Sequence, residues 1–330
     1  MIDREMLYNI IYALAARDGR ETALFGDCAP SALEAFRRSL AGKGFPELWF
    51  ELPLSGAPWF DLHVLASSEN LDSATVFTPD TCGGNPSAFA WFATQERGVR
   101  QLALSWDVSA GSIDCPAVQL LASTSNAQVT CGFLTAVGRE DAVLAYRSFV
   151  ERLPQGWFAC YTGVFPEREV PYLRVECIPG TALQRVYAED ASLLEAHLRQ
   201  TGLADLGDTI LPRCQELAAT PFTLEFQFDV DAHGCASKTF GASVRFAMPP
   251  GTTEWQPFNP DGEAGMLMRQ VKSWGLADDR WQLLADTTFA KRVQFAGEKA
   301  MLFCFPAFLK LRWCDGEPLD AKAYLMAGVQ

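Results

Sequence analysis

The chain repeats one pattern of hydrophobic and polar positions, in which an amphipathic helical stretch is followed by two short strands of alternating character. The pattern occurs five times, in repeats at about 30–67, 85–123, 138–178, 189–248 and 263–328. Repeats of roughly 50 residues indicate supersecondary units that build one closed architecture. We therefore expect a single domain, 1–330, that includes an N-terminal helical segment at 1–29 with Tyr8, Ile11 and Leu14 buried.

The alternation divides each predicted strand into an apolar and a polar face, because neighbouring strand residues point to opposite sides of a sheet. In the predicted strand at 222–229, one face holds Phe222, Leu224, Phe226 and Phe228, and the other holds Thr223, Glu225, Gln227 and Asp229. The remaining strands are predicted at 47–52, 59–66, 101–108, 117–122, 156–164, 171–177, 239–248, 307–313 and 321–326. The helical stretches are predicted at 31–41, 87–96, 140–153, 192–200, 208–217, 264–273 and 279–289.

Helices that cover the apolar faces would leave the polar faces turned toward a shared interior. Closing the sheet would also remove its exposed edges. The sequence thus predicts an α+β fold, a closed antiparallel ten-stranded β-barrel with a polar lumen surrounded by helices. A barrel of about ten strands is wider than side chains alone fill, so a ligand chamber is expected.

Composition narrows the class of partner. The formal net charge of -13 argues against a nucleic-acid surface, and no run of about twenty apolar residues predicts a membrane span. The short apolar stretch at 7–16 has no signal-peptide layout, so a cytoplasmic location is expected. The ten cysteines contain no CxxC pair and the three histidines lie far apart, which favours reduced thiols and disfavours a histidine-rich metal site.

Three short segments carry a resemblance to a known family: Phe60-Asp61-Leu62-His63-Val64, Lys310-Leu311-Arg312 and Lys322-Ala323-Tyr324. Together with the repeats, they resemble the soluble aromatic prenyltransferases of the ABBA family, whose PT-barrel has five helix-strand-strand-helix units. The resemblance implies transfer of an allylic prenyl group from its diphosphate to an aromatic small molecule or a peptide side chain, in secondary metabolism. It implies an acidic lumen residue at Asp61 and a diphosphate held and shielded by Lys322 and Tyr324. The resemblance also implies that the reaction requires no cofactor and is compatible with Mg²⁺.

The chemistry of such a reaction needs cations around the leaving phosphates, aromatic rings around the carbocation and a group that accepts a proton. Strand parity places these basic and tyrosine residues in the lumen as candidate substrate-binding groups: Arg174, Arg245, Lys310, Arg312, Lys322, Tyr172 and Tyr324. The predicted acidic wall, from the first two repeats, holds Glu47, Glu51, Asp61 and Asp107. Asp61 is the predicted acid-base residue, with His63 as its neighbour or substitute.

Other functions remain open. Glu176, Glu225 and Asp229 could neutralise the cations, and Trp49, Trp59 and Trp157 could plug the lumen. The alternative to a transferase is a non-catalytic PT-barrel-like protein that binds a peptide or an apolar metabolite, and a third class is another enzyme centred on the acidic wall. Cations that converge within reach of a phosphate favour the transferase, whereas one-to-one ion pairs favour the binding protein.

Overall fold

The structure is a computed structural model that describes residues 20–27, 47–67, 86–95, 99–107, 117–122, 127–165, 173–246, 258–295 and 298–329. Its strands are β1 (Glu47–Pro53), β2 (Asp61–Ser67), β3 (Val99–Asp107), β4 (Ala117–Ala122), β5 (Trp157–Val164), β6 (Leu173–Pro179), β7 (Thr223–Val230), β8 (Ala236–Arg245), β9 (Phe289–Phe295), β10 (Glu298–Cys314) and β11 (Glu317–Val329). Its helices are α2 (Arg20–Phe25), α4 (Pro86–Ala93), α5 (Ala127–Ala136), α6 (Asp141–Arg152), α7 (Thr181–Glu189), α8 (Ala191–Gln200), α9 (Ile210–Ala218), α10 (Glu263–Ser273) and the 3₁₀ helix η2 (Asp279–Thr287).

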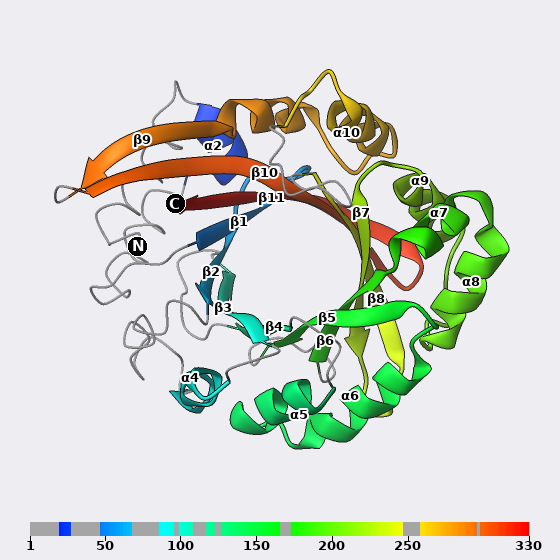
Figure 1. Cartoon of the computed structure of the whole chain (residues 1–330). Helices are drawn as coiled ribbons and strands as arrows, with labels where there is room; N and C mark the ends of the chain where they lie inside the picture. Colours follow the sequence, from blue (N-terminus) through cyan, green and yellow to red (C-terminus); the bar gives the residue numbers. More distant parts are fainter. Residues whose placement is uncertain are drawn as a thin grey trace.

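The strands form a closed ring with the helices on its outside (Figure 1). One antiparallel sheet runs in the order β11-β1-β2-β3-β4-β5-β6-β7-β8-β10-β9, and pairing of β10 with β11 closes it. Strand β9 pairs with β10 at the end of this order and lies outside the ring, so the barrel itself has ten strands. The closed antiparallel barrel predicted from the repeats is confirmed.

The outward faces of the strands form the hydrophobic core beneath the helices. Leu48, Phe50 and Leu52 of β1 are 0% exposed, as are Phe226 and Phe228 of β7. Each such side chain stabilises the fold by about 2 kcal/mol through removal of apolar surface from water. The alternate residues on the same strands, among them Glu51 and Glu225, face the lumen, as the strand parity predicts. Among the described helices, none is long and apolar enough to cross a membrane.

Several element boundaries differ from the predicted ones. The predicted helix at 279–289 is the 3₁₀ helix η2, and it is followed by the unpredicted strand β9. Strand β10 begins at Glu298 rather than Ala307, because its first residues pair with β9 on the side where its later residues, Phe308–Cys314, pair with β8. Helices α5 and α7 were also unpredicted. In α5, Gly132 lies against the Trp91 ring, and a Cβ there would come within 3.1 Å of the indole nitrogen. The predicted helix at 31–41 and the N-terminal positions Tyr8, Ile11 and Leu14 lie outside the described residues.

Trp157 lies on the outer side of the barrel and does not plug the lumen. Its ring stacks on Phe226 at 4.9 Å between centroids, and its indole N–H donates to the Tyr187 hydroxyl at 2.6 Å. The same hydroxyl lies 2.6 Å from His197 Nδ1. The hydroxyl oxygen accepts from Trp157, and its proton is free to be donated to an unprotonated Nδ1 of His197. This chain of bonds joins α7 and α8 to β5.

Replacing Tyr187 by phenylalanine is expected to lower the free energy of unfolding by about 1 to 3 kcal/mol, because the indole N–H and His197 lose buried partners. Burial lowers the pKa of His197, so protonation of its ring at acid pH disfavours the native state and stability rises with pH through this window. The slope between pH 5 and 7 should be shallower in the variant. Urea denaturation measures both effects, with Val186→Ala at the neighbouring exposed position as control. Equal stability of wild type and Tyr187→Phe would contradict the assignment.

Candidate functional site in the barrel lumen

Two lysines face each other across neighbouring strands of the lumen wall. Lys310 on β10 is the register partner of Lys322 on β11, and the two residues are 5% and 3% exposed. Lys322 Nζ also lies 4.6 Å above the ring of Trp59. Like charges directly opposite each other on paired strands destabilise a sheet. This point in the lumen therefore attracts negative charge.

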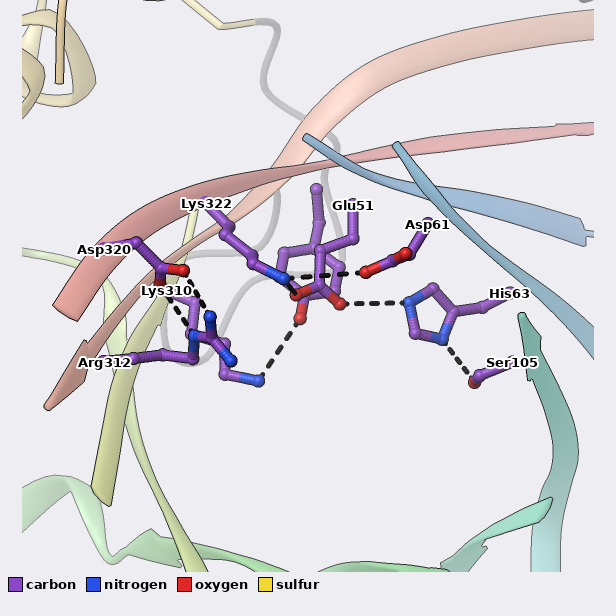
Figure 2. A network of polar contacts seen from close by, with 9 residues as sticks. Glu51, Asp61, His63, Ser105, Lys310, Arg312, Asp320 and Lys322 are labelled. Carbon is purple, nitrogen blue, oxygen red and sulfur yellow. Dashed lines mark hydrogen bonds and ion pairs between the residues drawn. The ribbon is translucent and has the colours of Figure 1, made fainter. Parts of the chain in front are cut away.

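Glu51 on β1 supplies part of that charge. Its Oε1 lies 2.7 Å from Lys322 Nζ, and its Oε2 lies 3.2 Å from His63 Nε2. Figure 2 shows Glu51 between the lysines and the histidine. Burial alone would raise the pKa of Glu51, but Lys322, the hydrogen bond from His63 and the charge of Lys310 hold it well below its usual range. Glu51 is therefore ionised and sits at the centre of the network.

Asp61 and His63, the predicted acid-base pair, belong to the same network (Figure 2). Asp61 Oδ2 lies 3.5 Å from Lys322 Nζ, and the Asp61 residue is 2% exposed. His63 Nδ1 lies 2.5 Å from Ser105 Oγ on β3. Strand parity placed Glu51 on the acidic wall but gave it no special role. Its central position comes from the pairing of β1 with β11, which brings Glu51 opposite Tyr324.

Lys310 differs from the other lumen cations. Its Nζ lies 3.3 Å from the Tyr324 hydroxyl, and among the described residues no carboxylate lies within ion-pair distance of it. Burial lowers its pKa to about 7, with Arg174 and Arg312 adding repulsion. Burial and the charge of Glu51 hold the pKa of Tyr324 well above its usual range. Lys310 therefore gives up its proton more readily than an ordinary lysine, beside a phenol that keeps its own.

The three lumen arginines each pair with a carboxylate. Arg174 Nε lies 2.7 Å from Asp229 Oδ1, and Arg312 Nε lies 2.7 Å from Asp320 Oδ1, each in a two-bonded pair. Arg245 pairs with Glu225. Carboxylates therefore also lie among the cations of the later repeats, in addition to the predicted acidic wall. Two predicted positions, Tyr172 and the side chain of Asp107, lie outside the described part of the chain.

Glu176 and Glu225 form a second acidic cluster on β6 and β7. Glu225 is 1% exposed, and burial, reinforced by Glu176, raises its pKa to about 8 even though Arg245 opposes the shift. Ser243 on β8 donates to Glu176 Oε1 at 3.2 Å. Glu225 therefore takes up a proton more readily than an ordinary carboxyl group, although it pairs with Arg245.

The lumen side of the barrel remains accessible to solvent. The side chains of Arg245, Arg312 and His63 are 30%, 19% and 14% exposed, whereas the outward residues of the same strands are completely buried. Within the described ranges, no group of three histidine, cysteine or acidic residues could hold a metal ion. The network of charged side chains is therefore partly exposed to solvent within a largely buried wall.

No family model and no curated protein matches the sequence. Among solved structures, the fold is similar to the crystal structure of the prenyltransferase PriB in its apo form, with a TM-score of 0.52 and 11% sequence identity. The match covers 98% of this chain and 94% of that chain. At this identity the likeness bears on fold alone. The chain has a prenyltransferase-like barrel, with helices around ten antiparallel strands, as its resemblance to the ABBA family implied.

Proposed function

We propose that the chain is a prenyltransferase, which binds an allylic diphosphate in the barrel lumen and moves its prenyl group onto an aromatic small molecule or a peptide side chain. The observation that carries this proposal is the opposed pair Lys310 and Lys322, of which Lys310 has no carboxylate partner among the described residues. The prenyltransferase-like fold supports the same assignment.

The donor diphosphate would lie between Lys310 and Lys322, with the Tyr324 hydroxyl donating to a phosphate oxygen. When the allylic C–O bond breaks, its electron pair goes to the diphosphate, and the two ammonium groups stabilise the charge that develops there. The arginines would remain in their carboxylate pairs. The rings of Tyr324 and Phe308, whose centroids lie 6.0 Å apart, would face the allylic cation from the lumen wall.

The acceptor carbon or heteroatom would then form the new bond to the prenyl group and lose one proton. Glu51 is the proposed proton acceptor, because it lies next to both lysines and is ionised. Once Lys322 turns toward the diphosphate, Glu51 loses its nearest counter-charge and becomes more basic. His63 would hold Glu51 in position through its Nε2 contact. Asp61 stays beside Lys322 as a second carboxylate.

The test is an assay with dimethylallyl, geranyl and farnesyl diphosphates, a panel of phenols, indoles and aromatic peptides, and either Mg²⁺ or EDTA. We expect release of diphosphate together with a prenylated product, and activity that persists in EDTA. Lys322→Met should abolish turnover, whereas Lys238→Met, at an exposed lysine paired with Asp315, should leave it unchanged. Absence of prenylated product from every combination would overturn the proposal.

A non-catalytic binding protein is the second candidate, because Arg174, Arg245 and Arg312 each pair with one carboxylate. On this proposal the lumen binds an apolar metabolite or a peptide without releasing diphosphate. Binding of a neutral ligand would then be insensitive to Lys310→Met. Calorimetry with wild type and this variant separates the two candidates, since a diphosphate donor requires the Lys310 ammonium.

A further inference from the structure

A small hydrophobic cluster occupies the lumen face of β1, β10 and β11, separate from the main core. We call it the aromatic end, and it consists of Trp49, Phe303, Phe305, Phe308 and Met326, packed around Ala307. Leu302 and Cys304, the alternate residues of β10, belong to the main core instead. The cluster is therefore a property of the lumen side of the barrel.

Strand register orders the cluster into three successive pairs beyond the two lysines. After Lys310 and Lys322 come Phe308 opposite Tyr324, then Phe305 opposite Met326, then Phe303 opposite Gly328. A bulge between Pro306 and Phe308 keeps all three phenylalanines on the lumen side. None of the three pairs contains a charged residue.

The rings form a continuous apolar surface along these pairs. Trp49, the register partner of Met326 on β1, lies 5.2 Å from Phe308 between ring centroids. Phe303 stacks on Phe305 at 5.9 Å. Trp49, Phe303, Phe308 and Met326 are only partly buried, so part of this apolar surface is exposed. Burial also raises the pKa of Glu47, the carboxyl that bonds the Trp49 indole, as expected in apolar surroundings.

We propose that the aromatic end binds the hydrocarbon chain of the donor, and that the preferred donor carries three isoprene units. This inference rests on the proposed function for the position of the diphosphate at Lys310 and Lys322. Strand residues rise ~3.3 Å each, so Gly328 lies ~20 Å along β11 from Lys322. One isoprene unit adds four bonds that each advance a little over 1 Å, or roughly 5 Å in total. One unit therefore reaches Phe308, and three units extend toward Phe303.

The probes are the thiolodiphosphate analogues of dimethylallyl, geranyl and farnesyl diphosphate, in which sulfur replaces the bridging oxygen and prevents ionisation. For wild type we expect Kd from calorimetry to fall about tenfold or more from the five-carbon to the fifteen-carbon analogue, because each unit buries further apolar surface. Met326→Trp fills the second pair and should remove this gain without changing the five-carbon Kd. Met301→Trp, the same change at a β10 position 37% exposed, is the matched control and should behave as wild type.

A second variant keeps the test valid if the tryptophan disturbs folding. Phe303→Ala should weaken binding of the farnesyl analogue about fivefold or more and leave the affinity for the geranyl analogue unchanged, since only the third isoprene unit reaches the Phe303 ring. Equal affinity of wild type for all three analogues, or equal weakening of all three by both variants, would overturn the inference. Farnesol and dimethylallyl alcohol separate the two proposals. If farnesol binds with the same response to Met326→Trp while no diphosphate binds, the apolar site stands and the donor assignment fails.

Discussion

Replacing Lys310 by methionine is expected to stabilise the fold and to abolish binding of an allylic diphosphate. The lysine is 5% exposed with a pKa of about 7, so below pH 7 the native state holds a buried ammonium without a carboxylate partner among the described residues. Methionine has a similar shape and no charge. From the pKa depression, we expect a gain of about 2 to 4 kcal/mol at pH 6. Loss of this ammonium, which has no carboxylate partner among the described residues, should weaken binding of the diphosphate analogue at least about a hundredfold.

The stability gained by Lys310→Met should depend on pH. The native pKa of Lys310 is lowered from its unfolded value, so between about pH 7 and 10.5 the unfolded chain binds more protons and stability rises with pH. The advantage of Lys310→Met should therefore be largest below pH 7 and disappear near pH 10. A bound diphosphate raises the pKa of Lys310, so wild-type affinity should fall above pH 7 by up to about tenfold per unit.

Urea denaturation from pH 6 to 10 and calorimetry with a thiolodiphosphate measure the two effects in the same samples. Lys238→Met is the control, because Lys238 is exposed and pairs with Asp315 at 3.3 Å outside the lumen. Lower stability of Lys310→Met at pH 6 would show that the ammonium has a partner in the native state. Unchanged diphosphate affinity would show that the anion binds elsewhere.

The fold could be predicted from strand parity, because the face to which each strand residue points depends on local sequence alone. The alternation at 222–229 assigns each residue to one face, and the burial of Phe226 and Phe228 beside lumen-facing Glu225 confirms the assignment. Closure of the sheet into a barrel follows from the same pattern. Ten strands that are each apolar on one face can bury those faces beneath the helices in few arrangements other than a barrel. Eight of the nine predicted site residues, among them Lys310 and Lys322, accordingly belong to the lumen network or its ion pairs.

Register and pairing could not be predicted from parity. Glu51 is central only because β1 and β11, almost three hundred residues apart in the chain, pair with Glu51 opposite Tyr324. The ion pairs of Arg174 and Arg245 likewise join strands whose relative shift the sequence pattern leaves open. The aromatic end depends on the bulge beside Ala307, which keeps Phe305 and Phe308 on one face although their spacing in the chain is odd. Local alternation predicts faces, whereas cross-strand neighbours require the fold.

Glu51 makes the second strong prediction, because its removal should change donor binding and transfer in opposite directions. Glu51→Gln leaves Lys322 without its 2.7 Å partner and removes the carboxylate that competes with a diphosphate for both lysines. The diphosphate analogue should then bind about tenfold more tightly. Loss of the proton acceptor should lower kcat about a hundredfold or more. The matched variant Asp61→Asn removes a carboxylate 3.5 Å from the same lysine and should keep most of the wild-type kcat.

Calorimetry and single-turnover transfer measure the two quantities in each variant. Breaking the buried pair should also lower the free energy of unfolding by about 3 kcal/mol, so both assays belong at a temperature where circular dichroism shows Glu51→Gln folded. If the Asp61→Asn variant loses transfer and the Glu51→Gln variant keeps it, Asp61 is the acid-base residue and Glu51 is not. Weaker donor binding by Glu51→Gln would mean that the carboxylate orients the lysines for the diphosphate instead of competing with it. Tighter binding with lost transfer would mean that Glu51 neutralises the two lysines while the lumen is empty. Glu51 would then accept the proton of the acceptor after the donor diphosphate has taken the place of Glu51 beside the lysines.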